Sequence, residues 1–200
     1  MQSAATAKLE RQRKRRQEVI DAAAAVFAEK GYHGASTRDI ALRLGMQQGS
    51  LYYHFPSKEA ALEEVCQVGV GDFVEGLAPI VESADPPAEK LRAAVANHLT
   101  QLRDKRAYVR VFLFERHYLP RSTRGQVASL SREYEALLER LFREGEAAGA
   151  FRKGLDAKMA VLAMNGMCNM AAARYRPGRE PSLEALIDGL VDLLLAAVHA

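Results

Sequence analysis

The sequence contains only two cysteines and no tryptophan, and its N-terminus lacks the apolar segment of a signal peptide. Cys66 and Cys168 are far apart and neither belongs to a C-x-x-C pair, so the sequence contains no zinc or redox motif of that kind. Both are interpreted as small buried side chains rather than as a disulfide. No apolar run reaches the roughly 20 residues that a membrane-spanning helix needs. These absences predict a cytoplasmic protein with no membrane partner.

Patterns typical of enzymes are missing as well. Gly69 and Gly71 are not followed by the Lys-Ser/Thr of a phosphate-binding loop, and no strand pattern precedes them. His98 has no second histidine, cysteine or carboxylate at metal-binding spacing. Because the sequence offers neither an activated nucleophile nor a metal cluster, we expect a protein that is not an enzyme and that needs no cofactor or metal.

Positive charge is concentrated near the N-terminus. Residues 1–60 hold ten Lys/Arg and six Asp/Glu, a balance of +4, whereas residues 61–200 hold 18 and 19, a balance of −1. A basic excess on one part of a chain is what attraction to a phosphate backbone requires. The segment 1–16 contains six of these positive charges and is either a solvated tail or helix start, or a basic arm that lies along DNA phosphates.

Between residues 36 and 58 the pattern predicts two short helices joined by a tight turn. Ser36 can cap the first helix, and Asp39, three residues later, completes a capping box. Gly45 follows the first helix at the position where a left-handed residue costs glycine no steric penalty. The second helix, roughly Gln48 to Phe55, must end before Pro56, because the residue before a proline is pushed away from helical angles.

The second short helix has a polar, aromatic surface. Leu51 and Phe55 lie one turn apart and can be buried, which leaves Gln48, Ser50, Tyr52, Tyr53 and His54 pointing outward. Amide side chains can pair with adenine edges, while hydroxyls, imidazole and lysine suit phosphates. This surface favours binding in a DNA groove. The alternative is a helical hairpin in an ordinary core, with the tyrosines half-buried.

The residues of this region resemble a known family. The series T-R-D-I-A, then L-G, then G-S-L-Y-Y-H-F-x-S-K-E is similar to the DNA-binding motif of TetR-family bacterial transcriptional repressors, without a gap from about Val19 to Leu62. The resemblance implies that Arg38 and Gln48 face bases. It implies that the DNA backbone is held by Thr37, Ser50, Tyr52, Tyr53, His54 and Lys58. Gln47 departs from the small capping residue common at this position, so we expect either a loosely started helix or a direct DNA contact.

Apolar residues at helical spacing continue to the C-terminus, and no strand pattern occurs. The predicted fold is all-α: a basic arm (1–16), a three-helix helix-turn-helix DNA-binding domain (17–58) and a helical ligand-binding and dimerisation domain (59–200). The last helix is apolar over more than one stripe, so it must be covered on more than one side. In the family that it resembles, the last two helices pack against a second subunit. The expected homodimer interface comprises Leu183, Leu186, Ile187, Leu190, Val191 and Leu194.

The C-terminal domain contains four methionines within residues 159–170. Methionine fills irregular gaps in cores, but it also lines adaptable pockets for hydrophobic ligands. Both interpretations stay open. The candidate effector pocket comprises Tyr108, Phe112, Glu115, Tyr134, Met164, Asn165, Met167 and Cys168, with Glu115 or Asn165 as the polar anchor.

A narrower resemblance concerns two short segments. Arg174-Tyr-Arg176-Pro-Gly, with Glu146-x-x-Gly149-x-Phe151-Arg152 upstream, is similar to TetR-type regulators of fatty-acid and sterol breakdown. It implies an acyl-coenzyme A thioester as the effector. The phosphates of coenzyme A would need cations near the mouth of the pocket, and Arg174, Arg176 and Arg179 are the nearest such cluster in the sequence. The alternative is a positively charged loop between dimer helices. Together these patterns predict a dimeric repressor that binds a near-palindromic operator and is released by a hydrophobic effector. The competing function is a DNA-binding activator or architectural protein without a small-molecule ligand.

Overall fold

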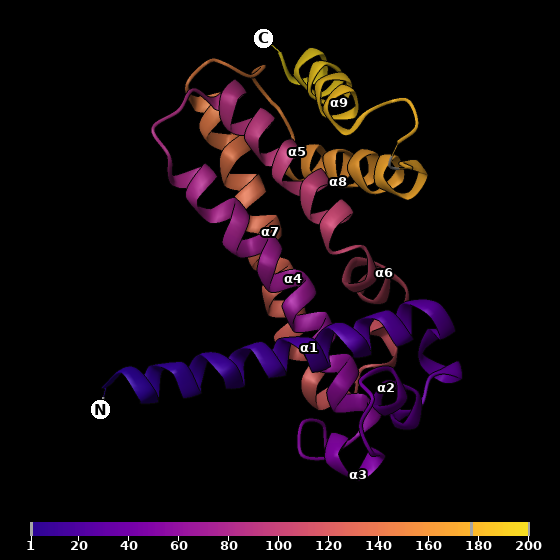
Figure 1. Ribbon diagram of the computed structural model, residues 1–200. Helices are drawn as coiled ribbons and strands as arrows, with labels where there is room; N and C mark the ends of the chain where they lie inside the picture. The colour runs from indigo at the N-terminus through magenta and orange to yellow at the C-terminus, as the bar shows by residue number, and fades with distance from the viewer. Residues whose placement is uncertain (1, 177, 200) are drawn as a thin grey trace. The chain divides into compact units, whose positions relative to one another are not determined.

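The computed structural model describes residues 2–176 and 178–199, and this part of the chain is helical with no strand. The N-terminal helices are α1 (Gln2–Gly34), α2 (Thr37–Arg43), α3 (Gln48–Leu51) and α4 (Lys58–Glu82) (Figure 1). They are followed by α5 (Pro87–Asp104), α6 (Arg106–Glu115), the short 3-10 helix η1 (Arg116–Tyr118), α7 (Arg121–Ala147), α8 (Ala157–Arg174) and α9 (Leu183–Val198). The all-α prediction is confirmed.

The chain forms two compact units, and α4 contributes to both. Unit 1 consists of Met1–Val70 with Ala107–Ala128, and unit 2 consists of Gly71–Arg106 with Ser129–Ala200. The sequence placed a domain boundary near Lys58, whereas the structure continues the first unit to Val70 and adds a segment from much later in the chain. Such long-range packing leaves no local signal in composition or helical spacing.

The core of unit 1 is built on one face of α1. Val19, Ala23, Val26 and Phe27 are almost fully buried, as their helical spacing predicts. They belong to the same cluster as buried side chains of the other helices of this unit, including Ile40, Leu51, Leu62, Tyr108 and Val111. Each large apolar side chain buried in this way contributes about 1.5–3 kcal/mol to stability. This cluster fixes α2 and α3 on the rest of the unit.

Unit 2 is organised around α5, which packs against both α8 and α9. Its buried face includes Leu91, Val95 and Leu99, and its N-terminal half is tied to α9 by an ion pair between Arg92 and Asp188 (2.7 Å). Figure 1 shows these three helices grouped together. Within the part of the chain that the structure describes, no helix is both long and apolar enough to cross a membrane.

The connection from α7 to α8 is held by Phe151. Its ring is buried against Phe142, and it occupies the space beside Gly145, where an added Cβ would lie only 2.1 Å from a ring carbon. The following peptide nitrogen, of Arg152, donates to Val198 O at the end of α9 (2.7 Å). Glu146 accepts a hydrogen bond from Gly154 N (2.6 Å). The segment Glu146–Arg152 therefore has a structural role in closing this turn.

Candidate DNA-binding site, effector region and dimer face

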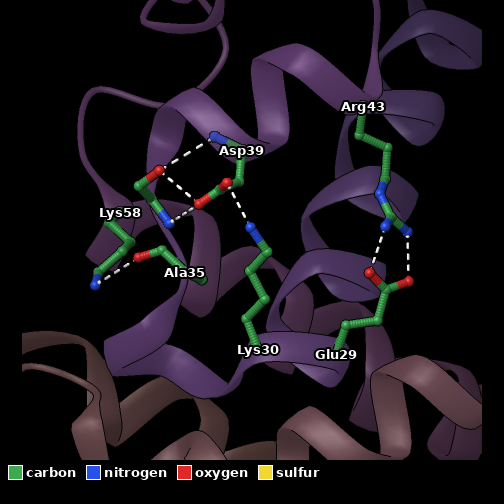
Figure 2. Close-up of polar contacts among 7 residues, drawn as sticks. Glu29, Lys30, Ala35, Asp39, Arg43 and Lys58 are labelled. Carbon is green, nitrogen blue, oxygen red and sulfur yellow. Dashed lines mark hydrogen bonds and ion pairs between the residues drawn. The ribbon is translucent and has the colours of Figure 1, made fainter.

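Two ion pairs and a capping box position α2. Ser36 and Asp39 form the predicted capping box, each side chain accepting from the other's backbone N–H. Asp39 also forms an ion pair with Lys30 of α1 (2.5 Å). The two terminal guanidinium nitrogens of Arg43 each donate to one carboxylate oxygen of Glu29, which is a bidentate ion pair (Figure 2). Hydrogen bonds from Lys30 and Ser36 lower the pKa of the Asp39 carboxyl to about 2. The two ends of α2 are thus fixed to α1.

The turn and α3 follow the sequence pattern, with one difference in length. Gly45 has a positive φ of 64°, and Leu51 and Phe55 are buried. The predicted helix Gln48–Phe55 is regular only to Leu51; residues 52–54 form a turn in which His54 N and Phe55 N both donate to Leu51 O. Pro56 disfavours helical angles in Phe55, the residue before it, so it sets the latest point at which the helix can end but does not account for the end at Leu51. Gln47 precedes α3 but its side chain makes no capping bond.

The outward surface of α2 and α3 carries the predicted DNA contacts. Arg38, Gln47, Gln48, Ser50, Tyr52 and Tyr53 are exposed, and Thr37 and His54 are half-buried. Tyr53 is 90% exposed, which argues against the alternative of a hairpin with half-buried tyrosines. The Gln48 amide nitrogen lies 2.9 Å from Thr37 Oγ1. The structure therefore brings Thr37, Gln48 and Tyr52 together, because the Gln48 amide nitrogen lies within hydrogen-bonding distance of both hydroxyls. The roles of all the candidate residues remain a prediction.

Lys58 has a structural contact that the sequence did not indicate. Its ammonium donates to the backbone carbonyls of Tyr32 (2.8 Å) and Ala35 (3.1 Å), and it lies 4.2 Å from the centre of the Tyr32 ring. Figure 2 shows the bond to Ala35. Lys58 thus ties the last turn of α1 and the residue that follows this helix to the start of α4. An ammonium has three donors, so one remains for a DNA phosphate.

We expect the substitution Lys58→Met to lower the free energy of unfolding by about 1–3 kcal/mol, because it leaves two carbonyls without their donor while keeping the aliphatic stem. It should also reduce the slope of log affinity against log salt by about one. Lys14→Met, in the exposed part of α1, is the control and should alter only the salt slope. Urea unfolding and DNA titrations at several salt concentrations measure both effects. Equal stability of the Lys58 variant and the parent would rule out the structural contribution.

The basic arm is helical. Residues 6–18 are exposed and form the N-terminal half of α1, which extends beyond the rest of unit 1 (Figure 1). Arg15 pairs with Glu18 (2.9 Å) and Arg16 with Glu64 (2.6 Å), so part of the arm's charge is already compensated. Surface pairs of this kind are worth little and can exchange for phosphate contacts.

The candidate effector residues fall into two groups. Tyr108, Phe112 and Glu115 belong to unit 1. The Tyr108 hydroxyl donates to Asp21 (2.5 Å) on α1, and Glu115 accepts from the backbone N–H of Tyr32 (2.9 Å). The polar groups of Tyr108 and Glu115 thus already have partners on α1, which makes Glu115 a poor choice for the polar anchor of a ligand. The sequence grouped them with later residues because it could not show which unit α6 joins.

The other candidates lie in unit 2, where Tyr134, Met164 and Cys168 are buried and Asn165 and Met167 are half-buried. A side chain that the sequence left at the core edge joins them: His98 is buried, with Nδ1 2.6 Å from the Tyr134 hydroxyl and Nε2 3.4 Å from Asn169 Oδ1. Burial lowers the pKa of His98 to about 4 and raises that of the Cys168 thiol to about 12. Asn165 Oδ1 is buried without a hydrogen-bond partner in the described structure. The interior of unit 2 therefore contains a polar cluster among apolar walls.

The arginines at the end of α8 and in the segment after it lie on the surface. Arg174, Arg176 and Arg179 are exposed, and Arg176 donates to the carbonyls of Ala173 and Tyr175. Pro177, part of the same sequence motif, lies outside the described residues. Near Tyr175 is a cavity of about 30 Å³, room for little more than one water molecule, lined by Leu99, Leu102, Arg103, Arg106, Ala172, Tyr175 and Leu183. Arg103 and Arg106 are cations that sequence reasoning missed, because they lie far from the motif along the chain.

The structure changes the residues expected at a dimer interface. Leu183, Val191 and Leu194 are buried inside the subunit, and Leu186, Ile187 and Leu190 are half-buried. Half of the predicted residues thus pack on their own subunit, because a broad apolar surface does not specify which side of a helix turns inward. Large apolar side chains that are exposed instead are Leu193 on α9 and Met159, Leu162 and Met170 on α8. They lie within the two segments, 156–175 and 182–198, where the sequence predicts the interface.

Comparison with known protein families identifies both parts of the chain. Residues 19–65 match the family model for bacterial regulatory proteins of the tetR family, and residues 84–198 match that for the tetracyclin repressor-like C-terminal domain. The chain belongs to the TetR family. It is a DNA-binding transcriptional repressor of the helix-turn-helix type. The first match covers α2, α3 and the two ion pairs that fix α2 on α1, so the resemblance to TetR-family repressors is confirmed.

Relatives of this TetR-family chain match it over almost its whole length. The HTH-type transcriptional repressor KstR2 of Rhodococcus jostii is 28% identical, covering 90% of this chain and 89% of the relative. The fatty acid metabolism regulator protein of Bacillus subtilis is 24% identical, covering 96% and 99%. Among solved structures, AibR in complex with isovaleryl coenzyme A and operator DNA has a TM-score of 0.82 and 25% identity, covering 90% of this chain and 98% of AibR.

Proposed function

We propose that this repressor acts as a homodimer that binds a near-palindromic operator and is released by an acyl-coenzyme A thioester. The observation that carries the DNA-binding part is the exposed surface of α2 and α3, where Arg38, Gln48 and Tyr53 face solvent on a rigidly fixed support. Arginine and glutamine are the side chains that read guanine and adenine edges in the major groove. Tyrosine and serine hydroxyls and the basic arm suit phosphate contacts.

Dimerisation is supported by the exposed apolar side chains of α8 and α9. Met159, Leu162, Met170 and Leu193 are each 59–66% exposed, and all four lie on α8 and α9, two helices that contact each other. A patch of this kind marks a protein interaction surface. A second copy related by a two-fold axis would cover the same patch on both subunits and present two copies of α3 to a symmetric DNA site.

The effector part of the proposal rests on unit 2 and on the relatives. AibR binds isovaleryl coenzyme A, and the B. subtilis relative regulates fatty acid metabolism. In this chain, Met164 and Cys168 offer apolar walls, and Asn165 offers a buried acceptor without a partner. The acyl group would occupy this region. The phosphates of coenzyme A would need cations, and Arg106, Arg174 and Arg179 are exposed.

The effector is tested by titrating the complex of the protein with its selected operator duplex. The panel comprises acyl-coenzyme A esters of increasing chain length, the matching free fatty acids, and coenzyme A alone. We expect only the esters to lower operator affinity, by roughly 5- to 150-fold, and DNA to weaken ester binding by the same factor.

Two other results would count against parts of this proposal. Release by free fatty acids as well would remove the role of the arginines. No release by any compound would favour a regulator without a small-molecule effector, a possibility that the small cavity near Tyr175 supports.

A further inference from the structure

Gly31 kinks α1 just before the helix-turn-helix. Its backbone has a φ of 68° and a ψ of 166°, which is not a helical conformation. Residues 31–35, here called the connecting segment, lead from this kink to Ser36, the N-cap of α2. Because glycine populates many backbone conformations, Gly31 does not by itself fix the direction of the connecting segment. Contacts with other helices must therefore determine where α2 begins.

Tyr32, the residue after the kink, is held by side chains from other elements. Its backbone N–H donates to Glu115 Oε2 at the end of α6 (2.9 Å), and its carbonyl accepts from the Lys58 ammonium at the start of α4 (2.8 Å). Its hydroxyl donates to Glu59 Oε1 (2.6 Å), and its ring stacks on that of Tyr118 in η1, with centroids 5.1 Å apart. Tyr32 is only 7% exposed. The connecting segment is thus fixed by α4 and by α6 with η1.

The contact with Glu115 has a defined direction. A backbone N–H can only donate and an ionised carboxylate can only accept, so the bond has no reversed alternative. The other carboxylate oxygen, Oε1, lies 3.7 Å from the position that a Cβ on Gly31 would occupy, so the carboxylate lies against the kink itself. Glu115 is 83 positions from Tyr32 along the chain and outside the segment 19–65 that matches the tetR-family model. A residue outside the helix-turn-helix therefore supports its first helix.

We propose that Glu115 is a positioning residue for DNA reading. By accepting the N–H of Tyr32 it fixes the connecting segment, and through it the start of α2, in the orientation that the operator requires. A binding surface loses affinity and selectivity when the residues that support it leave it loose by about 1 Å. Tyr118 supports the same segment through its stacked ring. The inference rests on the proposed operator binding, and neither Glu115 nor Tyr118 is assigned a contact with DNA.

The test compares two neutral substitutions at the same position in the full-length protein. Glu115→Gln keeps a carbonyl oxygen that can accept the Tyr32 N–H, whereas Glu115→Leu is similar in size and has no acceptor. Both remove one negative charge, so any electrostatic effect on DNA binding is common to the two. On the duplex that the parent selects, we expect the Leu variant to bind at least about fivefold more weakly than the Gln variant, the lower end of what one base contact contributes. On a scrambled duplex the two should bind equally.

Tyr108→Phe is the control for a general loss of contact between α6 and α1. It removes the hydroxyl that donates to Asp21 (2.5 Å), a bond between the same two helices but outside the connecting segment. Its ratio of affinities for the selected and scrambled duplexes should equal that of the parent. Tyr118→Leu should lower this ratio as Glu115→Leu does, and it takes the place of that variant if circular dichroism shows Glu115→Leu to be unfolded.

Three outcomes would count against the inference. Equal ratios in the folded Gln and Leu variants would show that the acceptor at position 115 has no part in sequence reading. An equal fall of the ratio in Tyr108→Phe would show that it follows the packing of unit 1 in general. If the parent selects no sequence, the proposed operator binding fails first and the inference falls with it, whereas a parent that selects a site as well as its Leu variant does overturns the inference alone.

Discussion

Glutamate at Leu162 or Leu193 is expected to separate the dimer into folded monomers. Both side chains are exposed in the subunit, 66% and 61% respectively, so a carboxylate there is solvated in the monomer. In the proposed dimer the same carboxylate would be buried without a partner, which costs several kcal/mol per charge, and the two-fold axis places the change on both subunits. Light scattering should report half the mass, with helical content unchanged.

The matched control is Leu194→Glu, one residue further along α9. Leu194 is buried inside the subunit, so a carboxylate there should unfold unit 2 whether or not a dimer forms. Monomers of Leu193→Glu should also lose most operator affinity, because one recognition surface replaces two. A Leu162→Glu, Leu193→Glu double variant that remains a folded dimer would exclude this face as the interface.

Stability should fall by roughly 3 kcal/mol between pH 6.5 and pH 4 because of His98 alone. Burial lowers the pKa of His98 from 6.5 to about 4 in the folded protein. The unfolded chain therefore takes up a proton in this range before the folded one does. The stabilisation from neutral His98 is complete above pH 6.5 and is lost as the pH falls through 4.

Other groups, mainly carboxylates, titrate in the same range, so the measurement needs a comparison. His98→Gln keeps a side chain that can hydrogen-bond the Tyr134 hydroxyl but cannot titrate. Urea unfolding of both proteins at several pH values from 7 to 4 gives the free energy of unfolding of each. The difference between the two free energies should become smaller as the pH falls. Parallel curves would mean that His98 titrates normally and is not held neutral by its surroundings.

The sequence predicts the DNA-binding region well because its determinants are local. The capping box of Ser36 and Asp39, the left-handed Gly45 and the break before Pro56 each depend on residues within a few positions. The burial of Leu51 and Phe55 follows from helical spacing in the same stretch. The contact of Lys58 with Tyr32 O and Ala35 O could not be predicted, because it joins residues more than 20 positions apart through backbone carbonyls.

The effector and dimer residues are predicted less well, for two physical reasons. Long-range packing decides which compact unit a helix joins. Tyr108 belongs to unit 1 and Met164 to unit 2, although both lie in apolar helices. The face that a helix turns inward is ambiguous when apolar residues surround it, as in α9. Leu194 was therefore expected at the interface with a second subunit, whereas it is buried in its own subunit, and the exposed Leu193 was not predicted. His98 was placed at the core edge because a lone histidine gives no signal that Tyr134 will pair with it.

The central claim is that two copies of α3 read one symmetric DNA site. Hydroxyl-radical footprinting of the full-length protein on the duplex that it selects tests this most directly. We predict two protected half-sites related by a dyad, with centres one helical turn, roughly 34 Å, or a whole multiple of it apart. A single protected half-site, or uniform protection without sequence preference, would contradict the account.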